Sequence, residues 1–428
     1  MTAATVSTGH DRTGLLPRVV GLDAARGVAI LGMFAVHVGP QRGQSGSQWL
    51  DVFSGRSAAL FAVLAGVSLA LLSGGEQVPV GVSARQTLVR IAGRAVLIAA
   101  IGLALTELHT SVSVILVYYG IYFLLALPLL WLSLRSLATL TLTWAIGGPI
   151  LSFLIRAHIH QTTFGGSPTF SMFGSFAGLR ELGVMLVLTG AYPALTWMPF
   201  LLAGLTVGRL GIRSVRPRVV IGVGLVSAGV GYGGSWVAQH PFGGRQHLID
   251  TVSAALGTVE PGLRPEDILD ASAFGTVGTN SWWWLTVATP HSGTAFEVLG
   301  ATGVALMVIG ALLAAQRPLR IAMHPLSCAG SCSLSLYILQ MIGLHILMPV
   351  SYGATAISVG VLHRPSWALL SVFVLSSLIL ATLWRSFFRR GPAEWLLHEI
   401  TIRLAIAANK GWVRQRRNLI NAPTEGEN

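Results

Sequence analysis

The sequence predicts an all-α membrane protein, a polytopic bundle of transmembrane helices that crosses the bilayer about ten times. Hydrophobic residues occupy 53% of the 428 positions and charged residues only 10%, whereas soluble domains carry about 25% charged residues. Apolar runs of about 20 residues recur along the chain, and a helix of that length crosses the ~30 Å hydrocarbon core. Because backbone polar groups in lipid must pair internally, we interpret these runs as helices.

The predicted spans follow the apolar runs in order. Each is bounded by loops that carry most of the Arg, Asp and Glu residues. The spans cover approximately residues 20–38, 57–73, 91–108, 114–132, 137–155, 191–208, 219–238, 294–315, 327–349 and 367–384.

The distribution of Arg and Lys predicts which side of the membrane each loop occupies. With the N-terminus inside, twenty of the 28 Arg and Lys residues lie on the cytoplasmic side, seven lie outside and Arg26 lies within a span. Cytoplasmic loops carry the excess of positive charge in membrane proteins. We therefore expect both termini in the cytoplasm and the protein in the plasma membrane.

Three regions are expected. Residues 1–18 form a cytoplasmic tail, and residues 19–385 form the transmembrane domain, with outer loops near 156–190 and 239–293. Residues 386–428 form a basic cytoplasmic tail, in which the mixture of Arg, Trp395 and Leu404 predicts an interfacial amphipathic helix. The Trp282–Trp284 run is typical of an interfacial aromatic belt, and a sugar-stacking platform is the alternative.

The formal charge of +12 does not indicate nucleic-acid binding, because the basic residues lie in short loops between apolar runs. Lys410 is the only lysine, a bias typical of high-GC bacterial genomes. Cys328 and Cys332 are interpreted as small packing residues, and no residue set has the spacing of a metal site. The lipid bilayer is the expected partner, and a homodimer is compatible with the sequence.

Ionisable residues inside a span usually serve function, and the first span contains three: Asp23, Arg26 and His37. Eleven steps of ~100° bring Arg26 and His37 to the same helix face, ~16 Å apart along the axis. Asp23 and Arg26 are three residues apart and can pair. The plain interpretation is that Asp23 and Arg26 anchor the inner end of the helix and His37 caps its outer end.

Several further stretches form a pattern along the chain. They are Gly55–Gly66 in the second span, Ile115–Ile121 in the fourth, Tyr192–Arg209 in the sixth, His291–Gly300 entering the eighth, Leu334–Ile338 in the ninth and Arg390–Trp395 after the tenth. Together with the first span, they resemble the YeiB-type membrane proteins of the transmembrane acyltransferase superfamily. That family is related to the heparan-α-glucosaminide N-acetyltransferase catalytic domain.

This chain departs from the lysosomal acetyltransferases at one point. That group is similar in its Arg-Gly opening but has Asn where His37 falls, and its catalytic His lies in the first outer loop, before a Trp. The corresponding loop, Gly39–Ser54, contains Trp49 and no histidine. If a histidine is the essential base, the resemblance therefore implies that His37 takes the role.

The resemblance implies acetyl-CoA or another acyl-CoA as the donor, reached from the cytoplasm, and an acceptor outside. Arg26 would hold donor phosphates, since Arg forks suit phosphate, and His37 would act as a general base or carry the acyl group as an acyl-imidazole. Arg56 would bind an anionic acceptor or the CoA, or it is an interfacial anchor. No metal is implied, and the acceptor is an envelope glycan, a glycolipid or an amine.

A catalytic base needs an orienting partner. Glu297 is the first candidate and Asp51 the second. His291, Glu107, Tyr119, Tyr337 and Gln340 are candidate substrate-binding residues, with plainer interpretations for two of them: His291 as a polar residue at a helix start, and Glu107, beside His109, as part of a solvated turn.

Membrane-bound acyl transfer is the predicted function. The alternative from another class is a transporter or flippase for a lipid-linked or small polar substrate, which intramembrane Arg and His would suit. No paired broken helices are evident in the sequence to favour it. A non-catalytic membrane scaffold explains the hydrophobicity but not the alignment of Arg26 with His37.

Overall fold

The computed structural model describes residues 18–41, 44, 46–78, 80–159, 165–256, 264–348 and 364–420, with side chains described as far as residue 408. All regular secondary structure in this part of the chain is helical, which confirms the predicted fold class. Residues 1–17 and 421–428 of the two predicted tails lie outside the described residues, as do 160–164 and 257–263 in the predicted outer loops.

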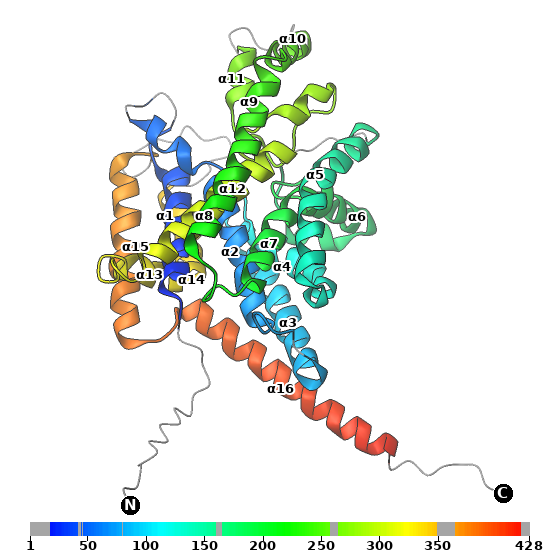
Figure 1. Ribbon diagram of the computed structural model, residues 1–428, viewed down its shortest axis with the longest axis vertical. Coiled ribbons are helices and arrows are strands. Elements are labelled where there is room, and N and C mark those ends of the chain that lie inside the picture. The colour runs from blue at the N-terminus through cyan, green and yellow to red at the C-terminus, as the bar shows by residue number, and fades with distance from the viewer. Residues whose placement is uncertain are drawn as a thin grey trace, which may run out of the picture.

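The helices run from α1 near the N-terminus to α16 near the C-terminus, as the colours in Figure 1 show. The longer ones are α1 (Val20–Val38), α2 (Arg56–Leu72), α3 (Gly81–Thr106), α4 (Leu116–Ala126), α5 (Leu134–Ala157), α7 (Ala194–Arg209), α8 (Pro217–Ala228), α10 (Gly244–Leu256), α12 (Ala295–Ala315), α14 (Ser333–Leu347), α15 (Trp367–Phe387) and α16 (Pro392–Ile420). The shorter ones are η1 (Ser47–Trp49), η2 (Asp51–Phe53), η3 (Leu127–Trp131), η4 (Phe170–Gly174), α6 (Phe176–Val184), η5 (Met185–Thr189), η6 (Gly229–Gly233), α9 (Gly234–Gln239), α11 (Pro265–Asp270), η7 (Trp282–Thr286) and α13 (His324–Ser331).

Every predicted span coincides with a helix, although not all meet the same length criterion. Seven helices in the described residues are long and apolar enough to cross a membrane, and up to nine if each of two bent pairs is one span. The bent pairs are Phe176–Thr189 with Ala194–Arg209, at 57°, and His324–Ser331 with Ser333–Leu347, at 77°. The predicted span 114–132 coincides with the shorter apolar helix Leu116–Trp131. The protein is therefore a multi-pass membrane protein.

Helix α1 lies at the centre of the bundle. It packs against α2, α12, α13, α14 and α15. Of the apolar stretch of α1, 67% is buried inside the protein, compared with 22% for the apolar stretch formed by α8 and α9. Small residues allow the closest of these contacts. At Gly330 of α13 a Cβ atom would collide with the backbone carbonyl of Asp23, and at Gly204 of α7 it would collide with that of Val63 on α2. Close backbone approach through small residues is how membrane helices associate.

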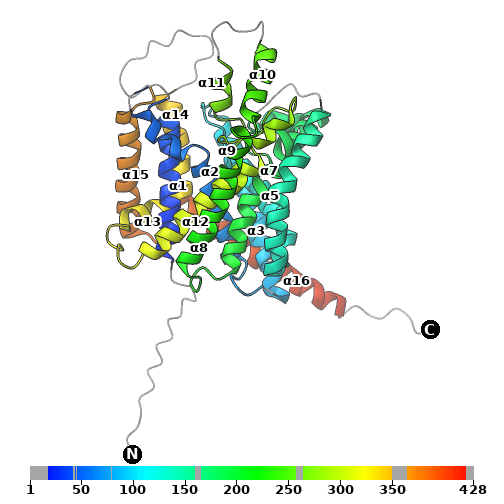
Figure 2. The same ribbon diagram turned by 45° about the horizontal axis from the view of Figure 1, so that its top comes forward.

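The two ends of the helical domain lie on the same face of the bundle. Arg18, just before α1, donates a hydrogen bond to the backbone carbonyl of Arg389, just before α16, at 3.0 Å. Helix α16 extends from this point along the base of the bundle, and α10 and α11 lie at the opposite end (Figures 1 and 2). This geometry is compatible with both termini in the cytoplasm, an orientation that stays a prediction.

The predicted outer loop 239–293 folds as a small cap. Helices α10 and α11 and the η7 turn enclose a separate cluster of buried side chains: Leu248, Val252, Leu269, Val277 and Val287. Trp283 of the tryptophan run stacks on His247, with ring centroids 5.2 Å apart. The cap therefore has its own apolar core at the end of the bundle opposite α16.

Candidate active site

His37 lies near the end of α1 and lines a small cavity of about 30 Å³, enough for a water molecule or two. Its Nδ1 atom is 3.0 Å from the Gln340 Nε2 atom of α14, which donates the hydrogen bond as the amide is placed. The Gln340 Oε1 atom is buried without a hydrogen-bond partner. Rotating the amide by 180° would bring this oxygen to Nδ1, so Gln340 can hold either neutral tautomer of His37.

His291 reaches the same cavity from the loop before α12, more than 250 residues along the chain from His37. Its ring stacks on Trp197, with centroids 5.6 Å apart, and meets the edge of Tyr192 at 5.5 Å. Burial lowers the pKa of His291 to about 4, because removing the ring from water disfavours its charged form. The cavity therefore holds a second imidazole that is neutral at pH 7.

The carboxylate of Glu297 holds the His291 loop in place. Its Oε1 atom accepts from the His291 backbone N–H at 2.7 Å, and its Oε2 atom accepts from the Gly293 N–H at 2.6 Å. Both donors belong to residues with positive φ, +60° and +65°, a conformation that is costly for histidine. Thr294 caps α12 by accepting from the Glu297 N–H, so the Thr-x-x-Glu pattern is a capping box whose acid reaches further back than usual.

Three more polar residues line the cavity and were not among the predicted site residues: Ser57, Ser113 and Tyr192. Tyr192 lies at the break of the bent pair that ends in α7. Its backbone carbonyl accepts from the Tyr122 hydroxyl. In the sequence, Tyr192 opens the stretch Tyr192–Arg209 that contributes to the family resemblance, but its position there does not indicate the direction of its ring.

Two of the predicted tyrosines occupy different environments. Tyr337 of α14 lines the cavity, and its hydroxyl accepts from the Ile115 N–H at 3.4 Å. Tyr119 of α4 stacks on Phe61, with centroids 5.9 Å apart, and is not among the cavity-lining residues. Its hydroxyl is buried without a hydrogen-bond partner.

The predicted carboxylates do not supply the hydrogen bond to His37 Nδ1, which comes from Gln340. Glu297 bonds to the backbone of the neighbouring loop, as described above. Asp51 is exposed in η2, and its backbone carbonyl accepts from Arg56. Glu107 caps the end of α3 and accepts from the Phe170 N–H at 3.1 Å.

Arg56 lies at the same end of the bundle as the cavity. Its Nε donates to the Tyr232 hydroxyl at 3.0 Å, and its guanidinium carbon lies 4.9 Å from the centre of that ring. Arg56 also interacts electrostatically with Glu297. Arg56 was predicted to bind an anionic acceptor or the CoA, or to anchor the span at the interface, and these roles stay predictions.

Arg26 lies at the other end of α1 and is not among the residues that line the His37 cavity. It forms an ion pair with Asp23 at 2.6 Å and donates to Ser68 on α2 at 2.9 Å. Arg94 of α3 lies close enough to interact electrostatically with Arg26, Arg90 and Arg390. The base of the bundle therefore holds a group of charges around Arg26 in which four arginines face two acids, Asp23 and Glu394.

Two family matches cover most of the chain. Residues 18–224 match the family described as Heparan-alpha-glucosaminide N-acetyltransferase, catalytic. Residues 270–403 match the family described as Protein of unknown function (DUF418), which contains the YeiB-type proteins. The two matches together support the resemblance to the YeiB-type membrane proteins. No match was found among the curated proteins.

Both matched segments contribute residues to the cavity of this protein. His37, Ser57 and Tyr192 come from the acetyltransferase-like segment, whereas His291 and Tyr337 come from the second. The acetyltransferase-like segment alone thus lacks the second imidazole. Among the described residues, no group of three or more His, Cys, Asp or Glu side chains is arranged to hold a metal ion.

Proposed function

We propose that this protein is a plasma-membrane acyltransferase that moves an acetyl or short acyl group from cytoplasmic acyl-CoA to an acceptor on the outer side. One observation carries the proposal: His37 and His291 line the same small cavity in a chain whose first half is similar to an acetyltransferase catalytic family. Neutral imidazole suits proton abstraction near pH 7. A packing role alone would not need two imidazoles at one cavity.

The group of arginines at the base of the bundle supports a donor site there. Arg94 interacts electrostatically with three other arginines, Arg26, Arg90 and Arg390, and with the opposing charge of Glu394. The Arg90 Nε atom is buried without a partner. Like charges this close are favourable only with a counter-charge, and guanidinium groups suit phosphate. The ~16 Å between Arg26 and His37 along α1 matches the length that a pantetheine arm would span.

The proposed reaction begins with an acceptor hydroxyl or amine at the cavity. His37 Nε2 takes the acceptor proton while the acceptor oxygen or nitrogen attacks the thioester carbonyl carbon. The carbon–sulfur bond then breaks, and CoA leaves as a thiolate that recovers the proton from the imidazolium. For Nε2 to act as base, Nδ1 must carry hydrogen, and Gln340 must present its Oε1 atom to it.

The other groups around the cavity have positioning roles in this proposal. His291, neutral at pH 7, offers a lone pair to a second acceptor hydroxyl, and Arg56 attracts an acceptor that carries negative charge. A cavity of about 30 Å³ is too small for an acyl group together with its acceptor. The proposal therefore includes a wider form, which movement of α14 about the 77° bend after α13 would create.

The two bent helix pairs give the transporter alternative a structural argument that the sequence lacked. Discontinuous helices commonly line the substrate site of transporters. Tyr192 lies at the break of one bent pair and Tyr337 lies on the other, and both line the cavity. Proton-coupled movement of a small polar substrate past His37 and His291 is thus the second candidate function.

Labelled acetyl-CoA separates the two candidates. We expect purified wild-type protein to hydrolyse or transfer the label and His37→Ala to lose at least 100-fold of that activity, since general bases contribute about 10²–10⁴-fold. His240→Ala, an exposed histidine in the outer segment, is the matched control and should remain active. Label retained on wild-type protein but not on His37→Ala would indicate the acyl-imidazole route.

Two results would count against the enzyme. Full activity in His37→Ala would remove the base from the proposed mechanism. Failure of wild-type protein to bind CoA, together with counterflow of a polar solute into vesicles, would establish the transporter instead.

A further inference from the structure

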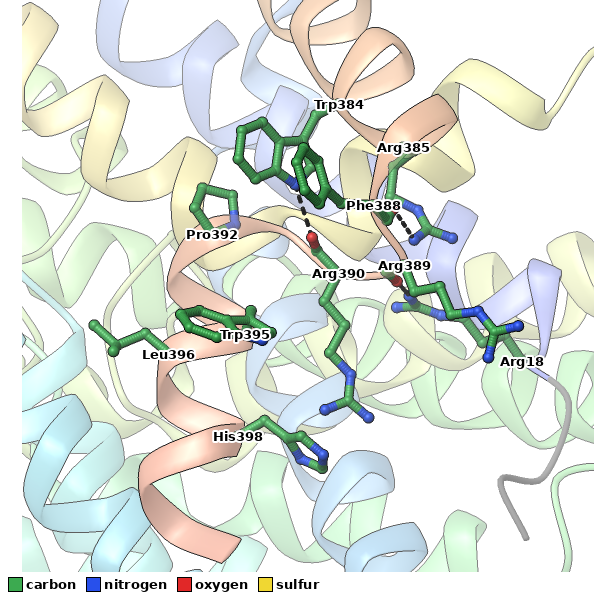
Figure 3. Close-up of a pocket in the computed structure, with 10 residues that line it drawn as sticks. All are labelled: Arg18, Trp384, Arg385, Phe388, Arg389, Arg390, Pro392, Trp395, Leu396 and His398. Atoms are coloured by element: carbon green, nitrogen blue, oxygen red, sulfur yellow. Dashed lines mark hydrogen bonds between the residues drawn. The ribbon is translucent and has the colours of Figure 1, made fainter. Parts of the chain in front are cut away.

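A large cavity lies away from the cavity lined by His37 and His291, where α15 meets α16. It has a volume of about 1270 Å³ and is open to the surface. Figure 3 shows Arg390 extending across it between Trp395 and the neighbouring side chains of Arg389 and Arg18. We call this cavity the α15–α16 pocket.

Hydrogen bonds hold the turn that forms one wall of the α15–α16 pocket. The turn between the helices is held by side chains that donate to its backbone carbonyls: Arg385 to Phe388 at 2.7 Å, Trp384 to Arg390 at 2.7 Å and Arg18 to Arg389 at 3.0 Å. Because residues that line the pocket donate these hydrogen bonds, the turn has a defined shape. It presents the side chains of Arg389 and Arg390 towards the opening (Figure 3).

The pocket has a marked excess of positive charge. Four arginines line it, Arg18, Arg385, Arg389 and Arg390, and no acidic residue does. Of these arginines, Arg18 pairs with Asp23 at 2.9 Å. The two nearby acids of α16 have other partners: Glu399 pairs with Arg403 at 2.8 Å, and Glu394 accepts from the Leu334 N–H at 2.6 Å.

Two observations show that the charges of Arg385 and Arg390 are only partly balanced within the protein, by Glu399 in the case of Arg390. Burial, and then the positive charges of Arg18 and Arg90, lower the pKa of Arg390. The Arg385 Nε atom is buried without a hydrogen-bond partner. An anion in the pocket would relieve the repulsion and supply acceptors for the donors that lack them.

The apolar part of the pocket indicates what carries that anion. Trp384 and Phe388 stack with centroids 4.4 Å apart, and Trp395 and Leu396 are more than half exposed on the first turn of α16. Exposed apolar side chains of the preceding span, including Leu380 and Leu383, lead up to this end of α15. Aromatic rings beside arginines at the end of a span are typical of the membrane interface.

From this combination we propose that the α15–α16 pocket binds the headgroup of an anionic phospholipid, with its acyl chains lying along α15. A phosphate would meet the arginines, and the glycerol and upper chain carbons would contact the indole and phenyl rings. Bound in this way, the lipid would fix α16 to the inner membrane surface. Arg390 belongs both to this pocket and to the arginine group of the proposed donor site, whereas Arg389 lines the pocket alone and can therefore test the lipid site separately.

Lipid retention by the purified full-length protein tests the proposal. Native mass spectrometry, with equimolar phosphatidylglycerol and phosphatidylcholine, should show one phosphatidylglycerol retained in preference to phosphatidylcholine. The exposed Arg389 side chain is the one to change. A basic residue near a membrane surface is worth about 1 kcal/mol, so Arg389→Gln should weaken phosphatidylglycerol binding about fivefold, and Arg389→Glu should weaken it further.

Matched variants make the result specific. Arg389→Lys keeps the charge and should retain most of the preference. Arg218→Gln removes an exposed arginine at the start of α8, at the same end of the bundle, and should leave lipid binding unchanged.

Three outcomes would overturn the proposal. In the first, Arg389→Gln and Arg389→Glu retain phosphatidylglycerol as the wild type does. In the second, phosphatidylcholine is held equally well, which would show annular lipid only. In the third, soluble CoA displaces the phosphatidylglycerol one for one, which would assign the pocket to a nucleotide. Because acetyl-CoA turnover is measured separately, loss of the lipid site is distinguishable from loss of catalysis.

Discussion

Glu297 offers the sharpest test of how the site is assembled. Its carboxylate accepts two short hydrogen bonds from the backbone of the His291 loop, at 2.7 and 2.6 Å. Glu297→Gln keeps the size of the side chain but turns one acceptor oxygen into an NH₂ group that faces an N–H. A hydrogen bond to a charged group contributes about 1.5–3 kcal/mol, so the loop should open more easily by that amount.

The expected magnitude follows from the free energy of local opening. A loss of about 1.5–3 kcal/mol corresponds to roughly 10- to 150-fold faster amide hydrogen exchange, because exchange of protected amides follows local opening. Exchange should accelerate at the His291 and Gly293 amides and stay unchanged in the α2–α7 core. The acyl-transfer proposal adds that activity falls in the same variant.

Two controls complete this prediction. Asp267→Asn changes an exposed carboxylate of the outer cap that pairs with Arg264 and should alter neither measurement. The reasoning would be refuted if the His291 and Gly293 amides exchanged at wild-type rates in Glu297→Gln, because the carboxylate would then not be what holds the loop.

Three further predictions address packing, pH and the orienting amide. Gly204→Ala should lower the thermal stability by the equivalent of about 1–3 kcal/mol, because its Cβ would collide with the α2 backbone, whereas Gly147→Ala, which meets open space, should not. The pKa of His291 falls from about 6.5 in the unfolded chain to about 4 on folding. Between these pH values the unfolded chain binds more protons than the folded protein, so the folding stability should fall as the pH drops from 6.5 towards 4. His291→Asn should show a shallower acid dependence in melting experiments, and an unchanged profile would contradict the assignment. Gln340→Leu removes the hydrogen bond to His37 and should lower acetyl-CoA turnover about 10-fold or more, with KM little changed; wild-type turnover would argue against an orienting role.

The local features of the fold were predictable from the sequence. Each predicted span coincides with a helix, because an apolar run in lipid has no other way to pair its backbone groups. The prediction of ten equivalent spans was less accurate. Two spans are bent at short breaks, one of them at Gly190–Pro193, and the span 114–132 is shorter than the others. Hydropathy averages over such breaks and does not record them.

The candidate site was predictable only in part. His37, His291, Tyr337 and Gln340 were recognised as candidates, because polar groups in or beside an apolar span are costly and therefore informative. Their pairing was not predictable. Gln340 was expected among substrate-binding residues, yet it forms the hydrogen bond to His37, and the expected partner Glu297 bonds to a loop instead.

The amino-acid sequence by itself determined the class of protein, the positions of its spans and the placement of Arg26 and His37 on one face of α1. These properties depend on composition and helical period, which act over one or two turns. Only the tertiary structure decided which residues meet at the cavity and that the α15–α16 pocket gathers four arginines. Such contacts join positions up to about 370 residues apart. They depend on where small residues let two helix backbones approach each other, which is a property of helix pairs and cannot be derived from one helix alone.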